Sequence, residues 1–248
     1  MKKLLALCSV VMILAVAACG GGGGGGGSSD DGSKCGGGGC NPMADIMLKS
    51  YTDGQAKAMY TVALHADAKA GQYWITKMVS DYGGAKSEMT DKWQVAAVSP
   101  DGVVVEQFMG SYGIVLAYLV DPSVSKEDSW KKGNVKKAWA GKPGTAPAEI
   151  QVMEVPKPTE GGPAPEKNYT DGVEDFKDVE LGGGKWSGKK SWMKMNDGSM
   201  ESSTWTADNG WFNGVIKMES KMAAGSSTMT LEKFGEGFEA EGKSWLKW

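Results

Sequence analysis

The stretch Val215-Ile216-Lys217-Met218-Glu219-Ser220-Lys221-Met222 decides the architecture of the second half of the chain. Apolar and charged residues alternate along it, so that in an extended chain Ile216, Met218 and Met222 share one side. A period of two is typical of a β-strand with one face against a core and the other in water. The stretch therefore predicts an antiparallel sheet with one apolar face that other elements must cover.

Turn signals on either side of this stretch divide the rest into similar strands. Asn196-Asp197-Gly198 and Asp208-Asn209-Gly210 are hairpin signals, and Ser99-Pro100-Asp101-Gly102 predicts a further turn in the first half. The strands that these and neighbouring turns delimit are expected at 73–80, 92–98, 103–109, 114–121, 189–195, 200–206, 215–222, 228–234 and 238–243. Residues 129–165 contain six prolines and read as more irregular.

A helical segment is expected before the first strand. Apolar residues between Ala44 and Ala70 recur at spacings of three and four, and Asp53-Gly54 divides them into two short helices. The one histidine, His65, falls near the end of the second helix and is expected to face solvent or cap it. The predicted fold class is α+β, a strongly curved antiparallel sheet covered by one or two N-terminal helices.

The first residues read as an export signal. Lys2 and Lys3 precede an apolar run over 4–18, and Val16-Ala17-Ala18-Cys19 resembles the lipobox of bacterial lipoproteins. The expected organisation is a signal peptide (1–18), a lipidated Cys19 with a glycine-rich tether (19–43), and one globular domain (44–248) with two halves joined near 152–170. Acyl chains on Cys19 would anchor the domain to a membrane. Gly20 after the cysteine resembles an outer-membrane address.

Two cysteines in the tether bracket four glycines. Outside the cytoplasm, a disulfide between Cys35 and Cys40 is the favoured interpretation. Two thiols are too few for a structural zinc site, and the spacing differs from that of a redox Cys-X-X-Cys motif.

Composition and motifs argue against most chemistry. A net charge of −3 without a dense basic patch argues against nucleic-acid binding, and a single histidine removes the commonest general base and metal ligand. The stretch 183–190 nearly matches a phosphate-binding loop, but Lys190 stands where Ser or Thr is needed, and a strand is expected to follow. No catalytic residue, cofactor or metal is expected, and the chain is predicted not to be an enzyme.

Methionines are concentrated in the second-half strands, and three explanations compete. They fill a core, they line an apolar cavity for varied ligands, or they are soft ligands for Cu(I). Core packing is the preferred explanation, with the cavity second and copper last. For the cavity, the expected lining is Met193, Met195, Ile216, Met218 and Met229.

Three segments resemble a family of uncharacterised bacterial envelope lipoproteins related to the LolA/LppX-type carriers. They are 70–78 (Ala-Gly-Gln-Tyr-Trp-Ile-Thr-Lys-Met), 135–144 (Val-Lys-Lys-Ala-Trp-Ala-Gly-Lys-Pro-Gly) and 204–219, from Thr-Trp-Thr to Gly-Val-Ile-Lys-Met-Glu. The resemblance implies a half-barrel with an apolar cavity for acyl chains. The functional hypothesis is a membrane-anchored, non-enzymatic lipoprotein that binds a lipid or another apolar ligand. The alternative is a structural or protein-interaction lipoprotein with a fully packed core.

Overall fold

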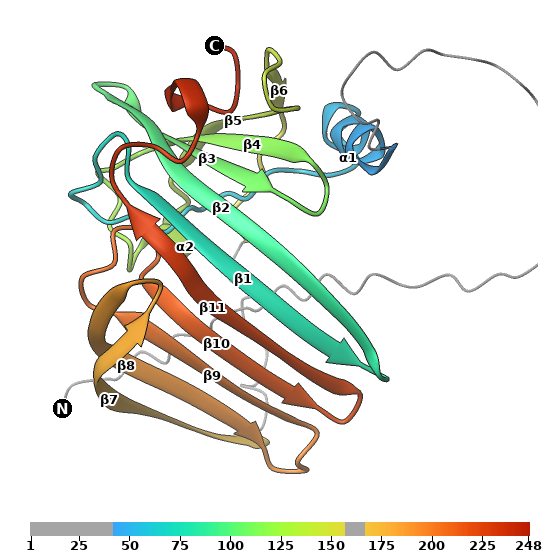
Figure 1. Ribbon diagram of the computed structural model, residues 1–248, viewed down its shortest axis with the longest axis vertical. Helices are drawn as coiled ribbons and strands as arrows, with labels where there is room; N and C mark the ends of the chain where they lie inside the picture. Colours follow the sequence, from blue (N-terminus) through green and yellow to red (C-terminus); the bar gives the residue numbers. More distant parts are fainter. Residues whose placement is uncertain (1–41, 157–166) are drawn as a thin grey trace, which may run out of the picture. The chain divides into compact units, whose positions relative to one another are not determined.

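The computed structural model describes residues 42–156 and 167–248, and most of them belong to one antiparallel sheet (Figure 1). The strand order is β6-β5-β4-β3-β2-β1-β11-β10-β9-β8-β7. The helices are α1 (Pro42–Thr52) and α2 (Ser129–Lys132), with a 3-10 turn at Glu241–Lys243. The strands are β1 (Tyr73–Tyr82), β2 (Ala85–Ser99), β3 (Gly102–Met109), β4 (Ile114–Val120), β5 (Val135–Gly141), β6 (Ala148–Ile150), β7 (Tyr169–Leu181), β8 (Gly184–Met195), β9 (Met200–Ala207), β10 (Val215–Met222) and β11 (Gly225–Gly235).

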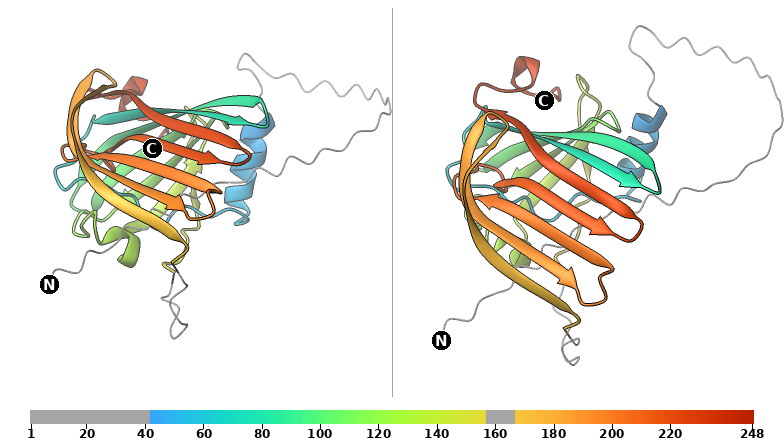
Figure 2. Two further views of the ribbon diagram at one scale, coloured as in Figure 1. Left: turned by 90° about the horizontal axis from the view of Figure 1, so that it is seen from below. Right: turned by 60° about the horizontal axis from the view of Figure 1, so that its bottom comes forward.

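The sheet is a meander whose first and last strands meet in its middle. β1 pairs with β11, so the half formed by β1–β6 and the half formed by β7–β11 are continuous through one ladder. The sheet curves strongly without closing (Figure 2). At its β7 end, Gly182 has a φ of +59°, and a Cβ there would lie 2.9 Å from Leu231 Cγ of β11. Glycine thus lets the β7–β8 turn lie directly on β11. The predicted curved antiparallel sheet of the half-barrel kind is confirmed.

We call the face of the sheet that carries the core the inner face and its opposite the outer face. Aromatic side chains from distant parts of the chain fill the inner side. Trp74 of β1 meets Trp186 of β8 edge to face, with centroids 5.5 Å apart, and Trp93 of β2 stacks on Phe212 at 4.5 Å. Trp211 contacts both Trp74 and Phe212, so the two pairs form one cluster. This aromatic core joins the two halves of the sheet.

The prediction of a second helix is wrong. Residues 56–64 form an extended segment, which we call the strap, instead of a helix. Within the strap, Ala58, Val62 and Leu64 are buried, at intervals of four and two residues. Ala58 forms a parallel bridge with Val152, and the side-chain amide of Asn134 holds both backbone groups of Val62 at 2.8 Å. The strap therefore satisfies its backbone hydrogen bonds with tertiary partners instead of a helical ladder. Of the two predicted N-terminal helices only α1 forms, and it contacts β4, β5 and β6.

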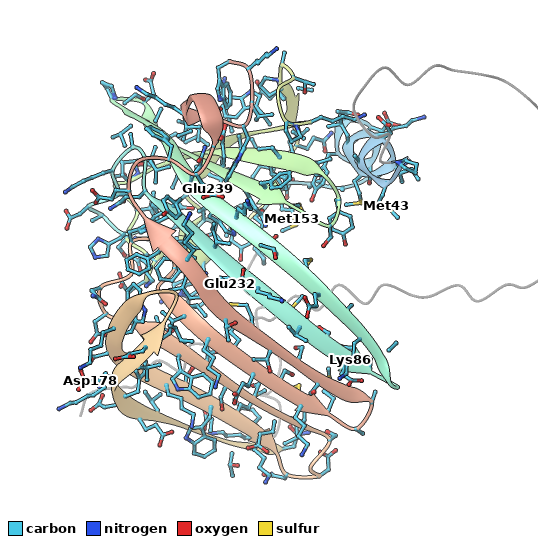
Figure 3. All side chains as sticks on the ribbon, in the orientation of Figure 1. Met43, Lys86, Met153, Asp178, Glu232 and Glu239 are labelled. Carbon is cyan, nitrogen blue, oxygen red and sulfur yellow. The ribbon has the colours of Figure 1, made fainter. Side chains whose placement is uncertain are left out.

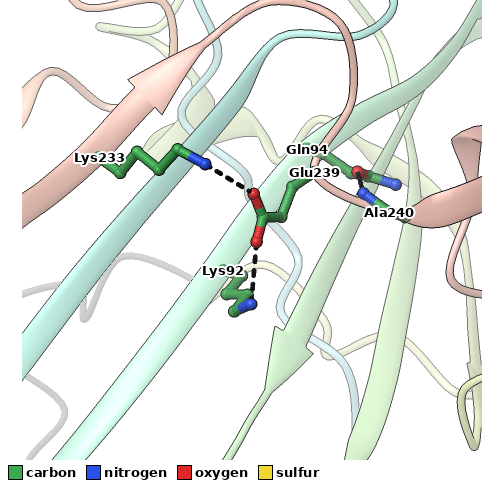
Figure 4. A network of polar contacts seen from close by, with 5 residues as sticks. All are labelled: Lys92, Gln94, Lys233, Glu239 and Ala240. Atoms are coloured by element: carbon green, nitrogen blue, oxygen red, sulfur yellow. Dashed lines mark hydrogen bonds and ion pairs between the residues drawn. The ribbon is translucent and has the colours of Figure 1, made fainter.

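The predicted last strand at 238–243 is also wrong, because the C-terminal segment packs on the outer face instead of extending the sheet. The Glu239 carboxylate forms ion pairs with Lys92 of β2 at 3.0 Å and with Lys233 of β11 at 3.4 Å (Figure 4). The backbone amide of Ala240 donates a hydrogen bond to Gln94 Oε1 at 3.1 Å. Burial alone would raise the pKa of Glu239, but hydrogen bonds and charge from the two lysines bring that pKa below its usual value.

A buried carboxyl group fixes the rest of the C-terminal segment. Glu106 of β3 has no exposed surface, and its oxygens accept hydrogen bonds from Gln94 Nε2 at 2.9 Å and the Trp245 amide at 3.0 Å. Ser244 Oγ and Trp248 Nε1 also donate to it. Leu246 packs beside these groups against Val115 and Ala117 of β4. Strands β3 and β4 are therefore covered on both faces.

Candidate functional site

Beyond the aromatic core, the sheet continues as one layer with side chains on both faces (Figure 3). Directly opposed residues in an antiparallel ladder share a face, so the strand register assigns each side chain to a side. On β1, Met78 lies four residues beyond Trp74 and therefore on the inner face. The register then extends that face to the neighbouring strands.

The inner face of this layer carries uncharged side chains on six strands, and we call it the neutral face. Its members are Met78, Ser80 and Tyr82 of β1, Ser87 and Met89 of β2, Ser191 and Met193 of β8, Met200, Ser202 and Thr204 of β9, Met218, Ser220 and Met222 of β10, and Ser227 and Met229 of β11. Most of these side chains are half-buried. These side chains are mostly thioethers and hydroxyls without charge, and carboxyl groups of the inner face lie at their margins, including Asp91 of β2, opposite Thr76, and Asp171 of β7, opposite Met193.

The outer face of the same layer is charged. Lys77 pairs with Glu88 at 2.7 Å, and Lys190 pairs with Glu174 at the same distance. Trp205 lies between two lysine ammonium groups, 4.8 Å from Lys217 and 5.1 Å from Lys190. Charged groups of this kind are stable where they contact water, so the outer face is the solvent-facing side of the layer. The alternation of apolar and charged residues predicted for 215–222 therefore also holds for the neighbouring strands.

The structure brings the predicted lining residues together on the inner side. Met193, Met195, Met218 and Met229 are half-buried on β8, β10 and β11. Ile216 has no exposed surface and packs in the hydrophobic core, at the end of the neutral face next to the aromatic cluster. The cysteines predicted to be lipidated or bridged, Cys19, Cys35 and Cys40, lie outside the described residues.

Sequence reasoning missed the methionines that the first half of the chain contributes to this face. Met78 and Met89 come from the first half of the chain, and the ladder between β1 and β11 places them beside Met229. The methionine spacing in each strand was visible, but the pairing of the first strand with the last was not.

Two pockets lie away from the predicted lining residues Met193, Met218 and Met229. One, of about 330 Å³, lies between the hairpin ends at 81–84 and 221–226. The other, of about 230 Å³, is lined by polar groups that include His65, Lys126 and Asp208. Burial lowers the pKa of Lys126. Neither pocket includes the predicted lining residues, and of the neutral face only Met222, at its edge, lines one of them.

The described residues offer little for acid–base or metal chemistry of the usual kind. In 42–156 and 167–248, no group of three or more His, Cys, Asp or Glu side chains is placed to hold a metal ion. His65 is partly exposed, and its backbone amide donates to Trp211 O at 2.8 Å. The stretch 183–190 forms a turn and strand β8, as predicted, and not a phosphate-binding loop.

The strands form an open, strongly curved half-barrel whose outer side carries ion pairs and whose inner side carries mostly uncharged side chains. Several solved structures match part of the chain at low sequence identity. One is described as an outer membrane lipoprotein-sorting protein domain from Vibrio parahaemolyticus, with 10% identity, 71% of this chain and 89% of that chain covered, and a TM-score of 0.30. Another is a DUF1329 family protein from Desulfovibrio piger, with 8% identity, the same coverages and a TM-score of 0.32.

A lipoprotein from Parabacteroides distasonis also matches, with 12% identity, 71% of this chain and 99% of that chain covered, and a TM-score of 0.28. No protein-family model and no curated protein matches the chain. None of the helices in the described ranges has the length and apolar character that a bilayer span requires.

Proposed function

We propose that this chain is a non-enzymatic lipoprotein of the bacterial envelope that holds an uncharged, apolar ligand on its neutral face. Lipid on Cys19 anchors it to the outer membrane, and residues 19–43 tether the domain formed by 44–248. The observation that carries the proposal is the contrast between the two faces of one sheet layer, with methionines and hydroxyls at the centre of the inner face and ion pairs on the outer face.

The neutral face favours a ligand on physical grounds. Half-buried methionines leave apolar surface in contact with water, and covering it gains about 25 cal/mol per Å². Thioether side chains adapt to ligands of different shape because they are unbranched and flexible. The thioethers themselves carry no charge that an acyl chain lying across them would desolvate.

The anchor is tested by the mass of the native protein and by labelling. Purified from membranes, the mature chain should begin at Cys19 and carry the extra mass of acyl groups. Cys19→Ser should abolish incorporation of radiolabelled palmitate, whereas Cys35→Ser should incorporate it as the natural chain does. An unmodified leader, or a mature end at another residue, would contradict the anchor.

The ligand site is tested by placing a charge on each face of one strand. Met218→Lys places an ammonium under the ligand, so binding of a fluorescent fatty-acyl probe to the full chain should weaken about tenfold or more. The matched control, Glu219→Lys, changes the adjacent residue on the outer face and should bind as the natural chain does. Equal binding by both variants, with the fold intact by circular dichroism, would refute the site.

The second candidate is a structural lipoprotein with a fully packed core. The aromatic core favours this candidate because side chains fill its interior, namely Trp74, Trp93, Trp186, Trp211 and Phe212. This candidate predicts that neither Met218→Lys nor Glu219→Lys affects any small ligand. It further predicts that the purified chain carries no apolar molecule.

A further inference from the structure

Four methionines form a continuous row across four adjacent strands. Met89 of β2 is directly opposite Met78 of β1, Met78 is opposite Met229 of β11, and Met229 is opposite Met218 of β10. We call these four residues the methionine row. They share the inner face, and each is half-buried rather than enclosed in the core.

The row brings sulfur atoms within reach of one another. Directly opposed residues have Cβ atoms about 4.5–5.5 Å apart. A methionine side chain has three rotatable bonds, so thioethers from three neighbouring strands are able to turn toward one point above the central residue. Core packing does not require such a row, since leucine fills the same volume with a better-defined shape.

Thioethers select a particular class of ion. They are soft, uncharged ligands suited to Cu(I) and poor ligands for Mg²⁺ or Ca²⁺, which prefer oxygen. Because three thioethers supply no negative charge, a monovalent ion suits them better than a divalent one. The next residues on the same face are serines, Ser87, Ser80, Ser227 and Ser220, so no lysine or arginine of the neutral face repels a cation.

One carboxyl group with a free oxygen lies beside the row. Asp91 is two residues from Met89 on β2 and opposite Met109 of β3. Its Oδ1 is buried and has no hydrogen-bond partner among the described residues, while its Oδ2 accepts a long bond of 3.4 Å from Gln107. A cation on the neighbouring thioethers would give this carboxyl group a favourable charge partner.

We propose that the methionine row binds one soft monovalent metal ion of the Cu(I) class, with Met78 and Met229 as its central ligands. This inference goes beyond the proposed function and does not depend on it. Leucine in place of methionine removes the sulfur but keeps an apolar side chain, so a loss of metal binding on this substitution reports on the sulfur.

The test uses the full chain with its cysteine thiols alkylated, labelled with ¹³C at the methionine methyl groups and titrated with Ag(I). The methyl resonances of Met78, Met89, Met218 and Met229 should shift together and saturate at one equivalent. Met78→Leu and Met229→Leu should each weaken Ag(I) binding about tenfold or more. Met193→Leu is the matched control, because Met193 is on the same face but opposite Ser202 and Asp171.

The outcomes separate this inference from the proposed function. Loss of Ag(I) binding in Met78→Leu and Met229→Leu, with Met193→Leu binding Ag(I) as the natural chain does, supports a metal site in the row whether or not the natural chain binds the acyl probe. No binding of Ag(I) by the natural chain, or equal weakening by Met193→Leu, overturns the metal site and leaves the acyl proposal standing.

Discussion

Trp74→Ala should lower the free energy of unfolding by about 3–5 kcal/mol, as expected for removal of a fully buried aromatic side chain. Trp74 has no exposed surface and contacts Trp186, Trp211 and Phe234, which come from β8, the loop after β9, and β11. Its removal leaves a cavity at the junction of the two halves of the sheet. Urea denaturation followed by circular dichroism measures the change.

Two further variants serve as an exposed control and as an intermediate case for this measurement. Trp130→Ala removes an indole that is 46% exposed and should change the free energy of unfolding by less than about 0.5 kcal/mol. Trp74→Phe should lose less than Trp74→Ala, because it keeps a ring and removes Nε1, a buried donor with no acceptor among the described residues. A Trp74→Ala variant as stable as Trp130→Ala would show that the aromatic cluster does not join the halves.

Glu106→Ala should cost about 3 kcal/mol or more of unfolding free energy. Its carboxyl group accepts hydrogen bonds from four donors, and each buried donor left without an acceptor costs about 1–3 kcal/mol. The donors on Ser244, Trp245 and Trp248 belong to the C-terminal segment. We therefore expect that segment to leave the outer face of β3 and β4 before the rest of the domain unfolds.

Hydrogen exchange and tryptophan fluorescence measure that release. In Glu106→Ala, the Trp245 amide should exchange with solvent faster, and emission from Trp245 and Trp248 should shift to longer wavelength. Glu149→Ala, which removes an exposed glutamate of β6, is the control and should do neither. Unchanged protection of Trp245 in Glu106→Ala would show that Glu106 does not hold the C-terminal segment.

Where one face is buried and one is in water, the sequence was sufficient to predict the strands. The stretch 215–222 is a strand with the predicted bounds, and the turns at Asp101-Gly102 and Asp197-Gly198 connect hairpins as predicted. These features are local, because alternation and turn chemistry act over a few residues. The curved antiparallel sheet follows from them.

Elements stabilised by distant partners could not be predicted in this way. The strap at 56–64 contains helix-favouring alanines, yet Asn134 and Val152 hold it extended. Strand β7 was missed because its sequence is rich in acidic residues, which suits an edge strand that must not pair further. Strands β5 and β6 were not predicted because they lie in the proline-containing region 129–165, which was expected to be irregular.

The candidate site was predictable in composition but not in arrangement. Periodicity placed Met218 and Met229 on one side of their strands. The pairing of β1 with β11 then adds Met78 and Met89, and no local pattern specifies a ladder between residues about 150 positions apart. The methionine row, and with it the case for a soft metal ion, therefore emerges only from the register.

Native mass spectrometry of the full chain, extracted from its own membrane, measures whether an apolar compound stays bound to the neutral face. We expect a non-covalent adduct with the mass of an acyl-chain compound, which Met218→Lys loses and Glu219→Lys keeps. A chain that is bare in all three forms, and that also takes up no fatty-acyl probe, would contradict a ligand on the neutral face.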